Sequence, residues 1–333
     1  SKSRMGKLKI YDMKKYIKVM MAFVLGLLMI GCDEDAMFRE ELYDKYIYIV
    51  SNEEQIHNLL FSLNKDKDMG TVSVACSGTQ KIDNDVQVTL EKDKDILGKY
   101  NYSNFDINEE KYAKELKNDS YEMPQMNVLL RHDDIDPYAT LPIVIKQEAL
   151  SSLSPDSTYF IPLRIKDVSG FQIKEEKRNV LCRIYTYNEY ANTKEATQYT
   201  MKGYRIIGDN SSSISGYKNV HPINANSVRM FVANTKFEAN EKIIAKNAVT
   251  VEVQKDNSIK MYPYIRDTKT LEVHLMTPPN DSEEDFIYQN VYEKKNERFL
   301  LYYKYRTRDN ENSWWSEWIV VKEATKRLNM QTK

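Results

Sequence analysis

Short runs in which apolar and polar residues alternate fill the chain from Tyr46 onward, and they constrain the fold more than any other feature. Gly, Asn, Asp and Ser residues separate the runs, at the spacing expected of antiparallel sandwiches and barrels. The first set of predicted strands covers residues 46–50, 71–75, 86–90, 126–130, 141–145, 159–165 and 180–187. The second set covers residues 199–207, 227–232, 248–254, 258–264, 270–276, 298–307 and 314–321. The sequence therefore predicts an all-β protein, with an N-terminal antiparallel Ig-like β-sandwich followed by a second small antiparallel β-barrel or β-sandwich domain.

The boundary between the two sets is predicted from composition. Residues 190–197 are polar and lack any periodicity, which indicates a linker between an N-terminal domain at 46–189 and a C-terminal domain at 198–330. One helix is predicted at 109–117, with Asn108 as its candidate N-cap.

The start of the chain has the layout of an export signal. Three lysines (Lys14, Lys15 and Lys18) precede twelve uncharged residues from Val19 to Ile30, fewer than the roughly 20 needed to cross a bilayer. The run ends in Met29-Ile30-Gly31-Cys32, which resembles a bacterial lipobox. That resemblance implies a signal peptide with an upstream extension at 1–31, lipidation of Cys32, and a lipid-anchored tether at 32–45. The alternative is a plain signal anchor with an incidental cysteine.

The acidic residues that follow the cysteine bear on localisation. Asp33-Glu34-Asp35 resembles the surface-export signal of Bacteroidetes-type lipoproteins, which implies an outer-membrane protein facing the cell exterior. The alternative is a solvated tether that anionic head groups repel.

Net charge and cysteine content limit the classes of partner. Seven Lys or Arg residues and one Asp precede Cys32, so the whole-chain charge of −1 becomes −7 from Cys32 onward. A mildly acidic chain without a basic cluster argues against nucleic acid as a partner. Cys76 and Cys182 lie in predicted strands of one domain, where a disulfide is geometrically feasible and buried free thiols are the simpler expectation.

The sequence offers no catalytic motif, and we expect no enzyme activity and no cofactor. Gly-x-Ser-x-Gly and phosphate-loop patterns are absent, and the four histidines are scattered among turns and strands. Acidic residues are numerous, but none lies in a motif that would pair two carboxylates across a glycosidic bond. The densest oxygen-ligand run, residues 131–136, lacks the glycine spacing of a dedicated calcium loop, so a solvated turn is expected there instead of a metal site.

Aromatic residues supply the candidate ligand-binding positions. Sugar rings stack on exposed aromatic faces, because the negative π-face of the ring attracts their weakly positive C–H groups. If residues 314–321 form a strand, Trp314 and Trp318 share one face, whereas Trp315 lies on the other with Ile319 and Val321 in the core. The alternative is that all three tryptophans pack inside the domain. The remaining candidates are tyrosines near the predicted linker, which could line an interdomain cleft: Tyr185, Tyr187 and Tyr190.

Several segments together resemble a family of Bacteroidetes-type surface lipoproteins found with Sus-like polysaccharide-utilisation systems. They include residues 86–90, 120–124, 139–145, 150–153, 159–165 and 168–173 for an N-terminal domain, and 220–230 and 299–305 for a C-terminal domain. Both domains have poorly defined functions in that family. The resemblance implies a non-catalytic surface protein that binds a polysaccharide or oligosaccharide and works beside Sus-like transporter components. The alternative is a structural or adhesive surface protein, a fimbria-type subunit or complex scaffold, that makes protein–protein contacts.

Overall fold

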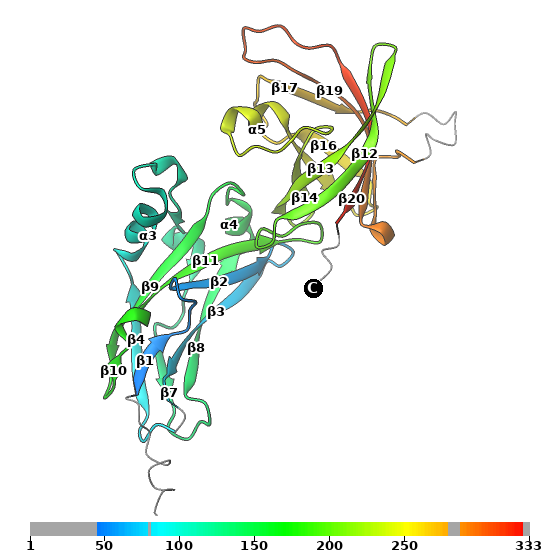
Figure 1. Ribbon diagram of the computed structural model, residues 1–333. Coiled ribbons are helices and arrows are strands. Elements are labelled where there is room, and N and C mark those ends of the chain that lie inside the picture. Colours follow the sequence, from blue (N-terminus) through cyan, green and yellow to red (C-terminus); the bar gives the residue numbers. More distant parts are fainter. Residues whose placement is uncertain (1–44, 79–80, 279–286, 329–333) are drawn as a thin grey trace, which may run out of the picture. The chain divides into compact units, whose positions relative to one another are not determined.

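The protein is described by a computed structural model at residues 45–78, 81–278 and 287–328, where strands predominate and the helices are short (Figure 1). The prediction of an all-β protein is confirmed. The predicted signal peptide and nearly all of the predicted tether lie outside the described residues. Within the described ranges, no helix is both long enough and apolar enough to cross a membrane.

Two sheets form the N-terminal sandwich. The first has the order β10-β1-β3-β8-β6, and the second has the order β2-β11-β9-β4-β7 with β5 paired to β9. The strands of the first sheet are β1 (Tyr46–Ile49), β3 (Lys67–Cys76), β6 (Tyr121–Glu122), β8 (Tyr138–Lys146) and β10 (Gln172–Ile173). Those of the second are β2 (Ile56–Ser62), β4 (Val86–Lys92), β5 (Lys114–Glu115), β7 (Asn127–Leu130), β9 (Tyr159–Val168) and β11 (Asn179–Tyr187).

Alternation along the strands builds the sandwich core. Leu141, Ile143 and Ile145 of β8 are fully buried, while the residues between them are more exposed. The predicted sandwich is confirmed, but it is not wholly antiparallel, because β2 pairs with β11, β1 with β10 and β5 with β9 in parallel. Cys76 and Cys182 are both buried, and they do not form a disulfide with each other, in line with the simpler expectation. Burial raises the pKa of the Cys182 thiol to about 12.

The predicted helix at 109–117 is wrong. A single 3₁₀ turn, η1 (Glu109–Lys111), is followed by β5, because the backbone there bonds to β9: Lys114 N–H donates to Thr158 and Leu116 N–H to Phe160. Among the described residues the longest helix is instead α3 (Ile96–Phe105), which lies against β9 and β11 and contributes to a small apolar cluster with Phe160. The other short helical elements of this region are α4 (Gln147–Ser151), η2 (Asn118–Ser120) and η3 (Glu175–Lys177).

The C-terminal domain is one strongly curled sheet with the order β16-β15-β14-β13-β12-β20-β19-β17, to which β18 adds beside β19. Its two end strands, β16 and β17, lie against each other, so the sheet nearly closes into a barrel (Figure 1). The strands are β12 (Thr197–Ile207), β13 (Asn210–Asn224), β14 (Ser227–Phe231), β15 (Ala248–Val253), β16 (Ile259–Pro263), β17 (Leu271–Leu275), β18 (Val291–Glu293), β19 (Arg298–Thr307) and β20 (Ile319–Arg327). The helical elements are α5 (Glu241–Asn247) and η4 (Lys294–Asn296).

The segment predicted as a linker is partly built into the second core. Tyr190 and Ala191 are buried in the same apolar cluster as the inward residues of β19. The Asn188 side chain accepts hydrogen bonds from the backbone N–H groups of both residues and donates to the carbonyls of Asn224 and Ser227. Residues 188–191 are therefore bonded to and packed against the C-terminal domain.

Candidate functional site

All three tryptophans lie on the hairpin of residues 308–318 that joins β19 to β20 (Figure 1). Along β19 the odd-numbered residues from Phe299 to Tyr305 are buried in the core, so Lys304 and Arg306 project from the outer face. The neighbouring strand β17 places Glu272 opposite Arg306 and His274 opposite Lys304. The hairpin is tied back to the sheet by two bonds: Ser316 N–H donates to the Thr307 carbonyl at 2.8 Å, and Thr307 N–H donates to Ser316 Oγ at 3.1 Å.

Two of the tryptophan rings stack with cations from the outer face of β19. Lys304 Nζ lies 4.7 Å from the centroid of the Trp318 ring, and the Arg306 guanidinium carbon lies 4.6 Å from the same ring. Arg306 also lies 4.9 Å from the Trp315 ring, and Arg308 lies 4.4 Å from it. Stacking of this kind attracts the cation electrostatically and fixes its position. We call the six residues Lys304, Arg306, Arg308, Trp314, Trp315 and Trp318 the tryptophan surface.

Trp314 is the outermost member of the tryptophan surface. Its side chain is 97% exposed, and it makes no ring or cation contact with any other described residue. A large apolar ring left in water loses the burial free energy that usually keeps tryptophan inside, which is about 1.5–3 kcal/mol for a large apolar side chain. Such a ring is available to stack against an apolar face of a ligand.

One part of the sequence prediction for this segment is wrong. The strand begins at Ile319 and not at Trp314, so strict alternation does not hold before it. Trp315 consequently turns outward and stacks on Arg306 and Arg308, instead of entering the core. From Ile319 the alternation does hold, with Val321 fully buried. Continuing the β19–β20 register by one pair places Trp318 opposite Arg306, on the outer face expected for it.

The sequence analysis did not single out the cations of the tryptophan surface. Lys304 and Arg306 lie two positions apart in a predicted strand, and Arg308 continues this spacing one residue past its end. This spacing is the signal that could have found them, since such residues share one face. The sequence could not show that a hairpin would carry two tryptophan rings back over that face. That contact depends on the turn at 308–313 and on the bonds between Ser316 and Thr307.

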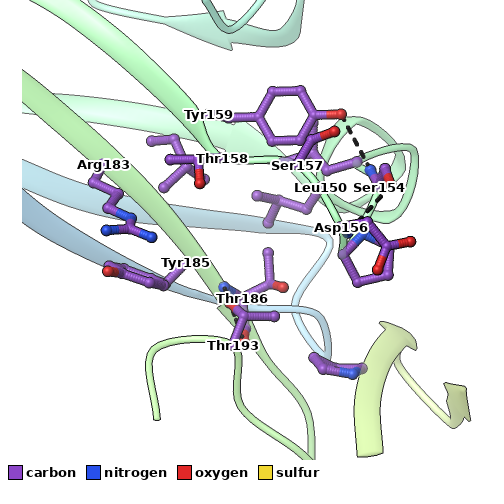
Figure 2. Close-up of a pocket in the computed structure, with 14 residues that line it drawn as sticks. Leu150, Ser154, Asp156, Ser157, Thr158, Tyr159, Arg183, Tyr185, Thr186 and Thr193 are labelled. Carbon is purple, nitrogen blue, oxygen red and sulfur yellow. Dashed lines mark hydrogen bonds between the residues drawn. The ribbon is translucent and has the colours of Figure 1, made fainter. Parts of the chain in front are cut away.

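The three candidate tyrosines do not form one site. Tyr185 on β11 is half-buried and lines a small cavity, where the Arg183 guanidinium lies 4.8 Å from its ring; Figure 2 shows these two side chains next to each other. Tyr187 is half-buried at the end of the same strand. Tyr190 is only 5% exposed and packs edge-on against the Tyr292 ring. Burial raises the pKa of Tyr190 to about 12, and its ring belongs to the apolar core of the C-terminal domain.

Two hollows of the described residues fit a glycan ring poorly. The cavity beside Tyr185 has a volume of about 130 Å³, below the roughly 300–1,000 Å³ of ordinary ligand pockets. A larger hollow of about 630 Å³ lies around Thr197 and Arg327, but none of its eight lining residues is aromatic. The exposed ring of Trp314 is therefore a better candidate than either of these two hollows.

Other chemistry is sparse in the described part of the chain. No group of three or more His, Cys, Asp or Glu side chains there could hold a metal ion. The expected turn at 131–136 is present, and its His132 pairs with Asp85 at 2.7 Å. That hydrogen bond raises the pKa of the exposed His132 imidazole. The pKa of Asp85 is lowered, first by the hydrogen bond that the His132 backbone N–H donates to it and then by the imidazole.

Comparisons with known proteins address the fold and the family. Residues 43–172 match the family model of an N-terminal domain, and residues 178–326 match that of a companion C-terminal domain. No curated protein has a sequence that matches the chain. Several solved structures share the fold at low sequence identity, all of them from Bacteroides.

Three of these structures illustrate the similarity. A Bacteroides ovatus protein of unknown function is 13% identical with a TM-score of 0.59, covering 85% of this chain and 94% of its own. A multidomain Bacteroides ovatus protein is 14% identical with a TM-score of 0.58 and the same two coverages. An auxiliary nutrient binding protein from Bacteroides thetaiotaomicron is 11% identical with a TM-score of 0.52, covering 83% of this chain and 92% of its own. The two domain matches cover residues 43–172 and 178–326, and these neighbours share the fold over most of the chain.

Proposed function

We propose that this protein binds glycans without cleaving them, on the cell surface, in support of a Sus-like polysaccharide uptake system. The observation that carries the proposal is the 97% exposure of Trp314 beside the stacked residues of the tryptophan surface. An exposed indole is costly to maintain unless it contacts a ligand or partner, and polysaccharides present repeated apolar C–H faces to such a ring. A structural neighbour is described as a nutrient binding protein, which agrees with this class of function.

The proposal includes the route to the surface. Cys32 would carry the lipid anchor and the acidic run after it would direct the protein to the outer face of the outer membrane, where the tryptophan surface meets polysaccharide. Sus-like transporter components would then receive the captured glycan.

The test compares single variants of the chain from Asp33 onward, which contains every described residue. We expect native electrophoresis in gels containing a panel of polysaccharides to show retardation of the wild type by at least one glycan. Trp314→Ala should weaken that binding about tenfold, because a stacked ring contributes on the order of 1 kcal/mol beyond its area. Tyr217→Ala is the matched control, since Tyr217 is a 68% exposed aromatic residue on β13 of the same domain.

Each outcome of this test bears on the proposal. Loss of retardation in Trp314→Ala alone supports both the function and the site. Equal loss in Trp314→Ala and Tyr217→Ala would show that the effect is not specific to the tryptophan surface. If no glycan in a broad panel retards the wild type, the binding function is wrong and the structural or adhesive alternative takes its place.

A further inference from the structure

The cations of the tryptophan surface are held mainly by aromatic rings and backbone carbonyls. Arg306 donates from Nε to Glu272 Oε2 at 2.6 Å, but its two terminal nitrogens have no hydrogen-bond partner among the described residues. Arg308 donates only to the backbone carbonyls of Lys269 and Glu311. Lys304 makes no ion pair with a described residue. An aromatic ring or a carbonyl holds a cation without neutralising it, whereas a carboxylate cancels its charge.

The acidic residues nearby leave the terminal nitrogens of Arg306 accessible. Glu272 pairs with the surface through Arg306 Nε. Asp309 on the hairpin pairs instead with Lys246 at 2.6 Å. The remaining hairpin carboxylates, Glu311 and Glu317, are exposed, and neither makes an ion pair with Lys304, Arg306 or Arg308 in the described ranges. A carboxylate of a ligand can therefore reach guanidinium N–H groups that no described carboxylate occupies.

Stacking also prepares the guanidinium groups for an anion. Arg306 lies near both Trp315 and Trp318, and its side chain is 29% exposed, so its position is restrained before any ligand arrives. A planar guanidinium presents a fork of N–H donors that matches the two oxygens of a carboxylate. Restraining it in advance lowers the entropy cost of binding.

We propose that the tryptophan surface binds acidic polysaccharides through their carboxylates, with Arg306 and Arg308 contacting uronate groups while Trp314 stacks on a neighbouring sugar ring. This inference rests on the proposed glycan-binding function and narrows its ligand to glycans that carry uronic acids. Trp315 and Trp318 then act as supports for the arginines and not as sugar platforms.

The test compares each acidic polymer with a neutral form of itself. Polygalacturonate, alginate and hyaluronate are used beside the same polymers after chemical reduction of the carboxylates to hydroxymethyl groups, in affinity gels at low and high salt. We expect at least one acidic polymer to retard the wild type, at least tenfold weaker binding after carboxyl reduction, and weaker binding at high salt. Arg306→Gln and Arg308→Gln should each weaken binding of the acidic form about tenfold.

Two controls make the result specific. Arg308→Gln is the cleaner of the two arginine variants, because Arg308 pairs with no described carboxylate, whereas Arg306→Gln also leaves the half-buried Glu272 without its partner. Arg183→Gln removes the same charge from an arginine stacked on Tyr185 in the N-terminal sandwich, and it should bind as the wild type does. Circular dichroism confirms that each variant is folded before its binding is compared.

The failures of the two proposals are distinguishable. Equal binding of the acidic and reduced polymers, or binding of neutral glycans alone, overturns the preference for uronates and leaves glycan binding intact. A preference for acidic polymers that persists in the Arg306→Gln, Arg308→Gln double variant shows that the anion site lies elsewhere. Absence of binding to any glycan, neutral or acidic, contradicts the proposed function itself.

Discussion

At the scale of single residues, Arg229 of β14 is a large charged side chain that is fully buried. Its Nη1 and Nη2 donate to the two carboxylate oxygens of Asp156 at 2.6 and 2.7 Å. His221 Nδ1 lies 3.4 Å from Nη2, and the rings of Phe237 and Tyr264 flank the guanidinium. Burial first, and then the Arg229 charge, lower the pKa of His221 to about 4. The native state therefore holds His221 neutral.

The first prediction concerns acid stability. Because the folded pKa of His221 lies below the unfolded value of 6.5, the unfolded chain takes up a proton at moderately acidic pH that the folded chain does not. Stability should fall as pH drops from 7.5 to 5, with His221 contributing about 2 kcal/mol to the loss. Urea unfolding followed by tryptophan fluorescence measures it, since all three tryptophans lie in this domain. His221→Gln should lose that part of the pH dependence.

A second histidine supplies the control for the sign of this effect. His132 has a raised pKa because Asp85 accepts its hydrogen bond, so any stability it contributes is present at low pH and lost as pH rises through its folded pKa. The stability of His132→Gln should therefore fall between pH 7.5 and 5 by at least as much as that of the wild type. If His221→Gln showed the same slope between pH 7.5 and 5 as the wild type, the neutral, buried state of His221 would be wrong.

At the scale of elements, the pairing of β12 with β20 depends on one glycine. Gly203 lies opposite Glu323, and a Cβ atom at this position would come within 1.9 Å of the Lys322 carbonyl oxygen and 2.8 Å of the Glu323 Cα. Both atoms belong to backbone and cannot rotate away. The same strands surround a buried ion pair, in which Lys218 of β13 donates to Glu323 of β20 at 2.6 Å. Any shift of β20 would disturb this pair as well.

A pair of glycine substitutions tests this dependence. Gly203→Ala should destabilise the C-terminal domain by about 3 kcal/mol, because overpacking against backbone cannot be relieved by a rotamer change. Gly216→Ala on β13 is the matched control, since the nearest atom to its added methyl would be Asn234 Cβ at an ordinary 3.7 Å. We expect that variant to be neutral or slightly stabilising in thermal and urea unfolding. Equal stability of the two variants would contradict the close β12–β20 approach.

Two elements that the sequence did not predict show what local patterns miss. β13 contains the run Asn210-Ser211-Ser212-Ser213, whose residues have little strand preference, yet it pairs with β12 along eleven rungs around a turn at Gly208. The pairing partner supplies the bonds that the side chains do not favour. Helix α3 was missed for a similar reason. It includes Gly98 and shows no clear apolar stripe, so its helical state depends on packing against β9 and β11.

At the scale of the whole molecule, each of the two β domains has its own apolar core. One gathers residues of β1 to β11, and the other gathers residues of β12 to β20 together with Tyr190 and Ala191. The tryptophan surface lies entirely on the C-terminal domain. For a binding protein of this kind to meet polysaccharide, the described domains must be held at the cell surface, which is the purpose we propose for Cys32.

The last prediction tests that anchor. In a Bacteroides host grown with radiolabelled palmitate, the full chain should incorporate label, fractionate with the outer membrane and be degraded when protease is added to intact cells. Cys32→Ala should lose the label and leave the membrane fraction, whereas Cys76→Ala should not, because Cys76 is a buried thiol of the first sandwich. Label that persists in Cys32→Ala would refute lipidation at this residue. If Cys32→Ala loses the label but protease does not degrade the wild type on intact cells, the protein is lipidated at Cys32 and lies inside the cell envelope.

The alternating runs by themselves determined the all-β class, the sandwich and the positions of most strands, because a two-residue period makes one face of a strand apolar wherever the strand lies. They also indicated that Trp318 faces outward. Only the tertiary structure decided that Trp315 stacks on arginines, that Tyr190 is buried, and that Lys304, Arg306 and Arg308 gather beneath the hairpin. These features depend on contacts between segments distant in sequence or on the path of a turn, and neither leaves a periodic signal in the chain.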